Sequence, residues 1–197
     1  MRHAAPTILL VSKPLAKPFN DATKNLVRDI VTAVPERRFH VLSQGDFSFG
    51  LKNVREEMIA LERPGWRPPY WRELRTFLRL IKPDGCGAYH FFFTPTVLSA
   101  RMVALAIAMK PRQPIIQTLC SAPSPDLPMA KLLFGDTIVT TSEHTRQRLL
   151  AKGVANVRAI LPGVAARERT ASREERLATR RALGLPEEAT IALYAGD

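Results

Sequence analysis

Basic and polar side chains gather between residues 13 and 24, after an apolar run at residues 7–12 and before a periodic apolar pattern. The side chains suited to contact an anionic or hydroxyl-bearing ligand are Lys13, Lys17, Asn20, Asp21 and Lys24. A helix that begins near Asp21 has free N–H groups and partial positive charge in its first turn, and both attract phosphate. Nearby ammonium groups add to that attraction. The segment therefore predicts a ligand-binding loop, although a capped helix with its lysines in solvent fits the same residues.

A second set of polar residues accompanies the aromatic run AYHFFF at residues 88–93. His90 lies inside this predicted strand, where a lone histidine among aromatic residues is usually structural and a ligand contact is the alternative. Thr94 and Thr96 come just after the strand, so they either contact a ligand or cap the next helix.

Ser142, Glu143 and His144 come directly after the apolar run at residues 137–140. At the end of a strand, Ser142 and Glu143 either hydrogen-bond a ligand hydroxyl or satisfy the first N–H groups of the helix that follows. A hydrolase relay is excluded, because three consecutive residues cannot line up as nucleophile, base and acid. The chain also lacks the G-x-S-x-G turn that exposes such a nucleophile.

Aromatic and basic residues are interleaved between residues 63 and 82, where a helix is predicted over residues 69–81. Trp and Tyr rings favour the membrane interface, and each basic residue near an anionic leaflet contributes about 1 kcal/mol. A membrane-contact surface is therefore predicted at Trp66, Arg67, Tyr70, Trp71, Arg72 and Arg75. A helix that packs on the core and has a solvated basic face is the alternative.

The sequence shows no metal-binding or cofactor-binding motif. The four histidines and the two cysteines, Cys86 and Cys120, have no paired ligand spacing. There is no P-loop, and no dinucleotide glycine fingerprint follows residues 7–12. We therefore expect neither a metal nor a cofactor, and two cysteines without a disulfide framework suit a reducing compartment.

The strands and helices that position these residues are predicted most clearly at residues 136–164. Residues 137–140 and 157–161 are short apolar strands, and the helix predicted between them ends at Gly153, which suits a left-handed residue. A strand, a helix and a parallel strand in this order form a right-handed unit. Two registers are open for the cap of the helix: Thr140 with Glu143, or Ser142 with Thr145.

The same alternation of strands and helices runs through most of the chain. Further strands are predicted at residues 7–12, 39–42, 58–61, 88–93 and 115–119, and helices at 21–34, 69–81, 94–109 and 127–133. Short, continuous apolar strands between helices are typical of a parallel sheet that is covered on both faces. The predicted fold class is therefore α/β, a Rossmann-like parallel sheet flanked by helices, with ligands at the carboxyl ends of its strands.

The composition narrows the range of partners. The chain has 197 residues and a net charge of +11, which favours phosphate-bearing substrates or an anionic membrane face. No recognition helix, zinc motif or RNA-binding motif supports nucleic acid as a partner. Residues 8–11 are too short for the apolar core of a signal peptide, and residues 102–109 fall far short of the roughly 20 of a spanning helix. We therefore expect a cytoplasmic protein whose contact with the membrane, if any, is peripheral.

The order of elements resembles the acceptor-side domain of two-Rossmann (GT-B) glycosyltransferases, in particular the large retaining family numbered four. The family's first strand, loop and helix are matched by ILLVSKP and FNDATKNLVRDIV, and its fourth strand by AYHFFFTPT. The family also has a characteristic run of strand, Ser-Glu-x-Thr, helix, Gly-Val, strand and Pro-Gly-Val. The segment DTIVTTSEHTRQRLLAKGVANVRAILPGV is similar to this run. The approach to its second domain resembles RRALGLPEEATIALYAGD.

Three positions depart from the family's pattern. The first loop reads Phe19-Asn20-Asp21 where the family often has a pair of glycines. Phe92 stands where a second histidine is common, and Cys120 stands where the fifth strand commonly ends in a histidine.

The resemblance implies a retaining hexosyltransferase that moves a sugar from a nucleotide-sugar donor to a hydroxyl of a sugar, lipid-linked or polysaccharide acceptor. Residues 1–164 would form the acceptor-binding domain, and residues 165–197 a linker, a helix and the first strand of a second domain that holds most of the donor site. This half alone would then be inactive. The implied substrate contacts are Lys13, Asn20, Asp21, Lys24, His90, Thr94, Ser142 and Glu143.

A binding module is the alternative to this enzyme. It would be a non-catalytic Rossmann-like domain that holds a phosphate-bearing ligand or an anionic membrane surface, as the net charge of +11 favours.

Overall fold

The computed structural model divides the chain into two compact units, Met1–Pro162 and Gly163–Asp197, and each is described by itself. The residues that it describes are 6–17, 19, 21–44, 47–59, 75, 78, 86–92, 94, 96–108, 113–124, 128–163 and 171–191.

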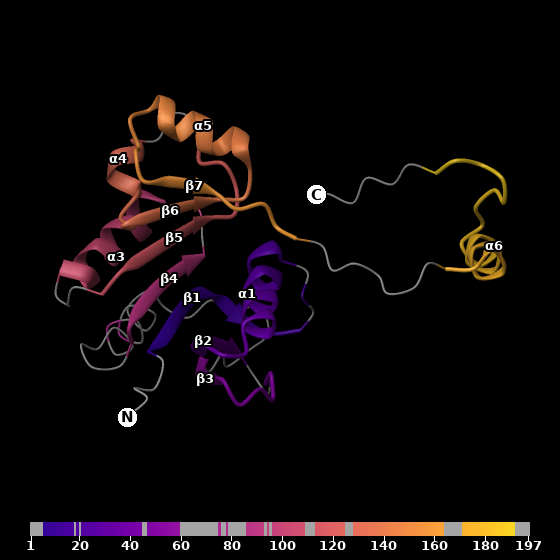
Figure 1. Cartoon of the computed structure of the whole chain (residues 1–197), viewed down its shortest axis with the longest axis horizontal. Coiled ribbons are helices and arrows are strands. Elements are labelled where there is room, and N and C mark those ends of the chain that lie inside the picture. The colour runs from indigo at the N-terminus through magenta and orange to yellow at the C-terminus, as the bar shows by residue number, and fades with distance from the viewer. Residues whose placement is uncertain are drawn as a thin grey trace. The chain divides into compact units, whose positions relative to one another are not determined.

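A seven-stranded parallel sheet is the centre of the first unit. The strand order is β3-β2-β1-β4-β5-β6-β7, which runs from the bottom to the top of the sheet in Figure 1. The predicted α/β class with a Rossmann-like parallel sheet is confirmed. The strands are β1 (Thr7–Leu15), β2 (Arg38–Gln44), β3 (Val54–Ile59), β4 (Ala88–Phe92), β5 (Ile115–Leu119), β6 (Thr137–Thr140) and β7 (Val157–Ala159).

Helices cover both faces of the sheet. They are α1 (Ala22–Ala33), α3 (Val97–Ala108), α4 (Met129–Leu132) and α5 (Glu143–Ala151). Val27 of α1 shares an apolar cluster with Leu10 and Phe92, whereas the cluster of Leu9 includes Val103 of α3. Successive side chains of a strand point to opposite faces, so α1 lies on one face and α3 on the other. The helices α4 and α5 pack with α3 in a third cluster, on its side of the sheet.

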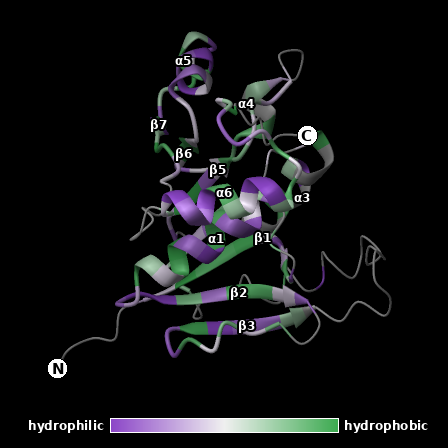
Figure 2. Cartoon of the chain, turned by 90° about the vertical axis from the view of Figure 1, so that its right-hand side faces the viewer, coloured by the Kyte–Doolittle hydropathy of each residue, from purple (hydrophilic) through white to green (hydrophobic). Residues whose placement is uncertain are grey.

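The position of a strand in the sheet, central or at the edge, explains how well the strand can be predicted from its sequence. The central strand β1 is a nearly continuous apolar run, and it is green for most of its length in Figure 2. The edge strand β3 contains Arg55, Glu56 and Glu57, and charged residues protect an exposed edge from pairing with other chains. The prediction of a strand at residues 58–61 was therefore wrong in its bounds, because the charged residues hid the true start at Val54.

The helix α5 begins and ends as its sequence allows. Ser142 is its N-cap, and the Ser142 hydroxyl accepts a hydrogen bond from the Thr145 amide at 3.1 Å, so the second of the two capping registers is the one observed. The Thr140 hydroxyl instead donates to the carbonyl of Ser142 at 3.0 Å. Gly153 follows the helix with a φ of +83°, the left-handed conformation that was predicted.

The last strand of the sheet is shorter than the predicted residues 157–161. The ladder between β6 and β7 ends where the Ile160 amide donates to the Thr140 carbonyl at 2.9 Å. Beyond Thr140 the chain turns into the cap of α5, so the residues after Ala159 have no strand to pair with on that side. Ile160 and Leu161 consequently remain 60% and 70% exposed.

The second unit contains one described helix, α6 (Arg173–Ala182), which follows a capping box formed by Ser172 and Glu175. Nη1 of Arg180 donates to the carbonyls of Pro186, Glu187 and Ala189 at 2.6, 2.9 and 2.8 Å, and so holds the segment after the helix. Most of the strand predicted at residues 190–194 lies outside the described residues. No helix in the described part of the chain is long and apolar enough to cross a membrane.

Candidate functional site

The strand order creates one topological switch point in the sheet. From β1 the chain continues through α1 to β2 on one side, and β1 pairs with β4 on the other side. In open parallel sheets the loops at such a point separate and leave a crevice at the carboxyl ends of the strands, where ligands commonly bind. The segments that follow β1, β4 and β5 therefore form the candidate site.

The side chains of Lys13 and Asp21 meet at the start of α1. The Lys13 ammonium lies 2.5 Å from Oδ2 of Asp21. Oδ1 of the same carboxylate accepts hydrogen bonds from the amides of Thr23 at 2.9 Å and Lys24 at 3.4 Å. Asp21 is thus the N-cap of α1, as the alternative interpretation of this segment predicted.

This cap changes the electrostatics of the helix end. Burial acts to raise the pKa of Asp21, but hydrogen bonds from Lys13 and from the Thr23 amide outweigh it and hold the pKa below its ordinary value. The carboxylate is therefore charged at neutral pH and already occupies the position that a phosphate would take. An anionic ligand at this helix would have to displace Asp21 or bind beside it on the ammonium groups of Lys13 and Lys24.

The loops after β4 and β5 are joined by hydroxyl groups. Oγ1 of Thr94 lies 2.6 Å from Oγ of Ser121, and it also accepts a hydrogen bond from the Ser121 amide at 3.2 Å. Both residues are at carboxyl ends of neighbouring strands, and Ser121 is exposed. The Thr94 hydroxyl also donates to the Ser121 carbonyl at 3.1 Å, so the exposed Ser121 hydroxyl oxygen is the group of this pair that can accept from a ligand hydroxyl.

Cys120 connects the end of β5 to the start of α1. Burial raises the pKa of the Cys120 thiol, whereas a hydrogen bond with the Thr23 side chain acts in the opposite direction. The charges of Asp21 and Lys13 also act on this thiol, so the segments at the ends of β1 and β5 lie close together. A thiol with a raised pKa is protonated at neutral pH and is a poor nucleophile.

His90 lies below this surface, on the α1 face of β4. Its ring is 3.8 Å from the Phe92 ring, centroid to centroid, and its Nε2 is 2.7 Å from Oγ1 of Thr118. Burial lowers the pKa of His90 to about 4, so the imidazole is neutral at pH 7. His90 therefore has its hydrogen-bond partner inside the sheet.

Ser142 and Glu143 lie at the end of β6, and both make bonds within α5. The Glu143 carboxylate accepts hydrogen bonds from Arg146 and Gln147, each at 2.6 Å. These bonds, that from Gln147 first, hold the pKa of Glu143 below its ordinary value. A carboxylate with a lowered pKa is not suited to act as a general acid near neutral pH.

Several predicted residues lie outside the described part of the chain. They are Asn20 and, from the predicted membrane-contact surface, Trp66, Arg67, Tyr70, Trp71 and Arg72. Arg75 is described and exposed, whereas Leu78 packs against the apolar cluster of Leu9. A membrane-binding helix and a helix with a solvated basic face would both have an exposed arginine and a packed leucine. These two residues therefore do not distinguish the two predictions.

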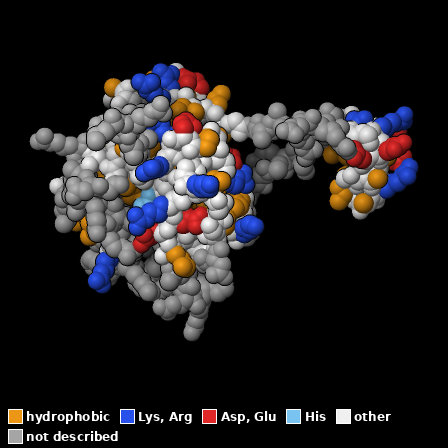
Figure 3. Space-filling model, turned by 60° about the horizontal axis from the view of Figure 1, so that its bottom comes forward, with side chains coloured by type: hydrophobic (Ala, Val, Ile, Leu, Met, Phe, Trp, Pro, Cys, Tyr) orange, Lys and Arg blue, Asp and Glu red, His pale blue; other side chains and the backbone are white. Residues whose placement is uncertain are grey.

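Charge is spread over the face of the molecule that Figure 3 shows. On the face shown in Figure 3, Lys and Arg side chains are dispersed among Asp and Glu rather than gathered in one patch. Among the described residues, no group of three or more His, Cys, Asp or Glu side chains is arranged to hold a metal ion.

Ser121 and Thr23 are site residues that the sequence did not single out. Ser121 lies two residues after the predicted strand at residues 115–119, so its position at a strand end was the available signal. Nothing in the sequence indicates the contact between Thr23 and Cys120, because it joins segments almost a hundred residues apart.

No protein-family model matches the chain, and no curated protein matches it. The class that the fold and the site define is a Rossmann-like α/β protein with a candidate ligand site at the carboxyl ends of β1, β4 and β5.

Proposed function

We propose that the chain is the acceptor-side half of a sugar-nucleotide-dependent glycosyltransferase. The observation that supports this most is the segment at residues 136–163. It is a strand, a Ser-capped helix, a left-handed Gly153 and a parallel strand, in the order of the motif that the sequence resembles. The switch point between β1 and β4 lies at the same edge of the sheet, where open parallel sheets commonly bind their ligands.

The site residues suit an acceptor better than a donor diphosphate. The start of α1 carries its own carboxylate, which opposes a second anion, whereas the exposed Ser121 offers its hydroxyl oxygen to a hydroxylated ligand. We therefore place the acceptor, a sugar that is free, lipid-linked or part of a polysaccharide, at these strand ends. The nucleotide-sugar donor would be held mainly by a second domain, and the anionic membrane face remains a proposed partner for residues 66–75.

The test is a transfer assay with the protein that the whole gene encodes. It is incubated with a panel of radiolabelled nucleotide sugars and with methyl glycosides or polyprenyl phosphates as acceptors. The proposal predicts transfer from at least one donor, with the anomeric configuration of the donor retained in the product. If a folded protein transfers no sugar from any donor, the proposal is wrong, and binding of phosphate or anionic vesicles would then favour the non-catalytic module.

A further inference from the structure

A hollow lies at the carboxyl ends of β1 and β2. It has a volume of about 340 Å³ and is lined by Ala16, Lys17, Gln44, Phe47 and Ser48. Pockets for small ligands commonly measure about 300 to 1,000 Å³, so the hollow is large enough for one small ligand. Ala16 and Lys17 belong to the segment after β1, whereas Gln44 ends β2 and Phe47 and Ser48 follow it.

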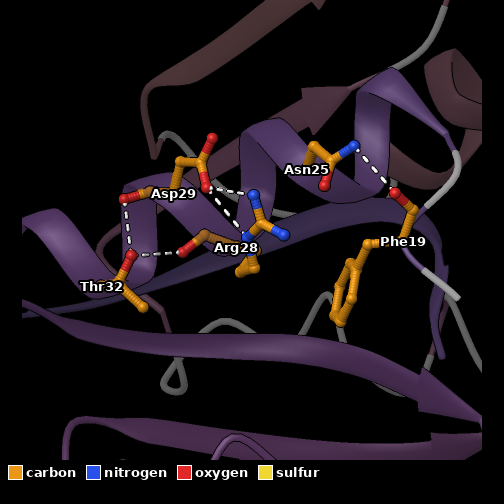
Figure 4. A network of polar contacts seen from close by, with 5 residues as sticks. All are labelled: Phe19, Asn25, Arg28, Asp29 and Thr32. Atoms are coloured by element: carbon orange, nitrogen blue, oxygen red, sulfur yellow. Dashed lines mark hydrogen bonds and ion pairs between the residues drawn. The ribbon is translucent and has the colours of Figure 1, made fainter. Parts of the chain in front are cut away.

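Contacts among aromatic rings, and of Phe19 with residues of α1, hold the aromatic wall of the hollow in place. The Phe47 ring makes edge-to-face contacts with Phe19 and Phe49, at centroid distances of 5.3 and 5.0 Å. The Arg28 guanidinium lies 5.2 Å from the centre of the Phe19 ring, and the Asn25 amide donates to the Phe19 carbonyl at 3.0 Å. Figure 4 shows Phe19 joined to α1 through this bond. The ring of Phe47 is therefore held in place before any ligand arrives.

Hydrogen bonds to Glu56 of β3 hold the polar wall of the hollow in place. Oε1 of Glu56 accepts hydrogen bonds from the Phe49 amide at 2.6 Å and from the Ser48 hydroxyl at 3.1 Å. The Ser48 oxygen also accepts from the Gly50 amide at 3.1 Å. Because a hydroxyl oxygen has two acceptor sites, Ser48 retains one for a ligand.

The remaining polar groups of the hollow are available for binding. Among the residues that the structure describes, the side chains of Lys17 and Gln44 have no hydrogen bond or ion pair. The Lys17 ammonium has three N–H donors, and the Gln44 amide has two donors and an acceptor. An aromatic ring with donors and acceptors around it matches a sugar ring, which has C–H bonds on one face and hydroxyl groups at its rim.

We propose that this hollow binds a pyranose ring, with the C–H face on Phe47 and the hydroxyl groups bonded to Lys17, Gln44 and Ser48. The inference rests on the proposed function and deepens it, because it adds a second sugar subsite, lined by residues from the ends of β1 and β2. The hollow then anchors one sugar of that acceptor at these strand ends.

The first experiment is an amide NMR titration of the whole chain with the methyl glycosides of glucose, galactose, mannose and N-acetylglucosamine. Inorganic phosphate and UMP serve as comparison ligands. The expected result is a saturable shift of the amides of Lys17, Gln44, Phe47 and Ser48 by at least one glycoside, at concentrations up to about 10 mM, which cover a millimolar Kd. If no glycoside shifts these amides, or if only phosphate or UMP does so, the inference is wrong.

The second experiment uses variants of the lining residues. Lys17→Ala and Gln44→Ala each remove hydrogen bonds to the sugar and should weaken glycoside binding about five- to tenfold. Phe47→Leu keeps an apolar side chain for the packing with Phe19 but removes the aromatic face, and it should weaken binding to a similar extent. The matched control is Lys52→Ala, because Lys52 is an exposed lysine that does not line the hollow. Equal affinity in the control and in all three variants would overturn the inference.

The two proposals fail in different ways. If the whole gene product transfers sugar but Gln44→Ala leaves the KM for the acceptor unchanged, the sugar site at the hollow is wrong and the transferase stands. If glycosides bind at the hollow but no nucleotide sugar is used as a donor, the transferase is wrong and the hollow stands as a sugar-binding site.

Discussion

At the scale of single residues, Asp21 determines what the start of α1 can bind. One oxygen of its carboxylate caps the helix and the other contacts the Lys13 ammonium. The same residue types that attract a phosphate when free neutralise each other when they are paired in this way. Residue types near a helix start therefore do not distinguish an anion site from a capped helix, and the hydrogen bonds of the folded chain do.

The contribution of this cap can be measured with two substitutions. Asp21→Ala removes the cap and should lower the free energy of unfolding by about 1 to 2 kcal/mol in urea titrations. Asp21→Asn keeps a capping oxygen and removes the charge, so the loss should stay below about 1 kcal/mol, as for other exposed ion pairs. Equal losses for the two variants would contradict the assigned cap.

The ion pair also has a defined pH dependence. The pKa of Asp21 in the folded chain lies below its ordinary value. Its contribution is therefore present above the ordinary pKa of about 4 and is lost as the pH falls through the lower folded value.

His90 should make the fold sensitive to mild acid. Its pKa is lowered to about 4 in the folded chain, so between the ordinary pKa near 6.5 and pH 4 the unfolded chain binds a proton that the folded chain does not. The free energy of unfolding should therefore fall by up to about 3 kcal/mol across this range. His90→Gln, which cannot take up a proton, should show a flatter pH profile in urea titrations. Parallel profiles for the two proteins would contradict the burial of a neutral imidazole.

At the scale of elements, the sequence predicts best where burial alone decides the structure. The bounds of β5 and β6 agree with the predicted residues 115–119 and 137–140, because both are apolar strands inside the sheet. The bounds of the edge strands were predicted poorly. The charged residues of β3 conceal its start in the sequence, and β7 ends where the neighbouring strand β6 turns away. The first reason lies in the sequence of β3 itself, whereas the second depends on the neighbour of β7.

The site was predicted less completely than the fold. A position after a strand can be read from the sequence, and it correctly placed Thr94 and Ser142 at the carboxyl edge of the sheet. The predicted end of the first strand at residue 12 was wrong, because β1 continues to Leu15 and Lys13 lies within it. The contact of Thr94 with Ser121 could not be read in this way, since it depends on which strands are neighbours. The hollow around Phe47 depends on contacts between α1, β2 and β3, so no single motif indicates it.

The end of α5 gives a prediction at the scale of an element. Gly153→Ala places a side chain on a residue with a φ of +83° and should lower the free energy of unfolding by about 1 to 2 kcal/mol. A Cβ at Gly153 would meet no atom within 4 Å, so the loss comes from backbone strain and not from a clash. Gly163→Ala is the matched control, because its Cβ is also unobstructed and its φ lies outside the left-handed region. The control should unfold like the wild type, and an equal loss in both variants would contradict the assignment.

At the scale of the whole molecule, the apolar core lies within the first unit. All residues of the three apolar clusters fall between Leu9 and Val157, whereas α6 contains no buried residue. We therefore expect residues 1–162 to fold by themselves.

Truncation after Pro162 tests this division. The shortened chain should unfold cooperatively, because the three described apolar clusters lie in the first unit. Leu149→Ala in the whole chain is the positive control, since removing a buried leucine should cost about 2 to 5 kcal/mol. A shortened chain that shows no cooperative unfolding would contradict this division.

The central claim is that a ligand binds at the carboxyl edge of the parallel sheet, around its switch point. Its most direct test is a map of amide NMR shifts over the whole chain during titration with glycosides and nucleotide sugars. The account predicts shifts at Lys13, Asp21, Thr94 and Ser121, next to the ends of β1, β4 and β5. Shifts confined to the amino ends of the strands, around Gly87, Asp136 and Asn156, or no shifts with any of these ligands, would contradict it.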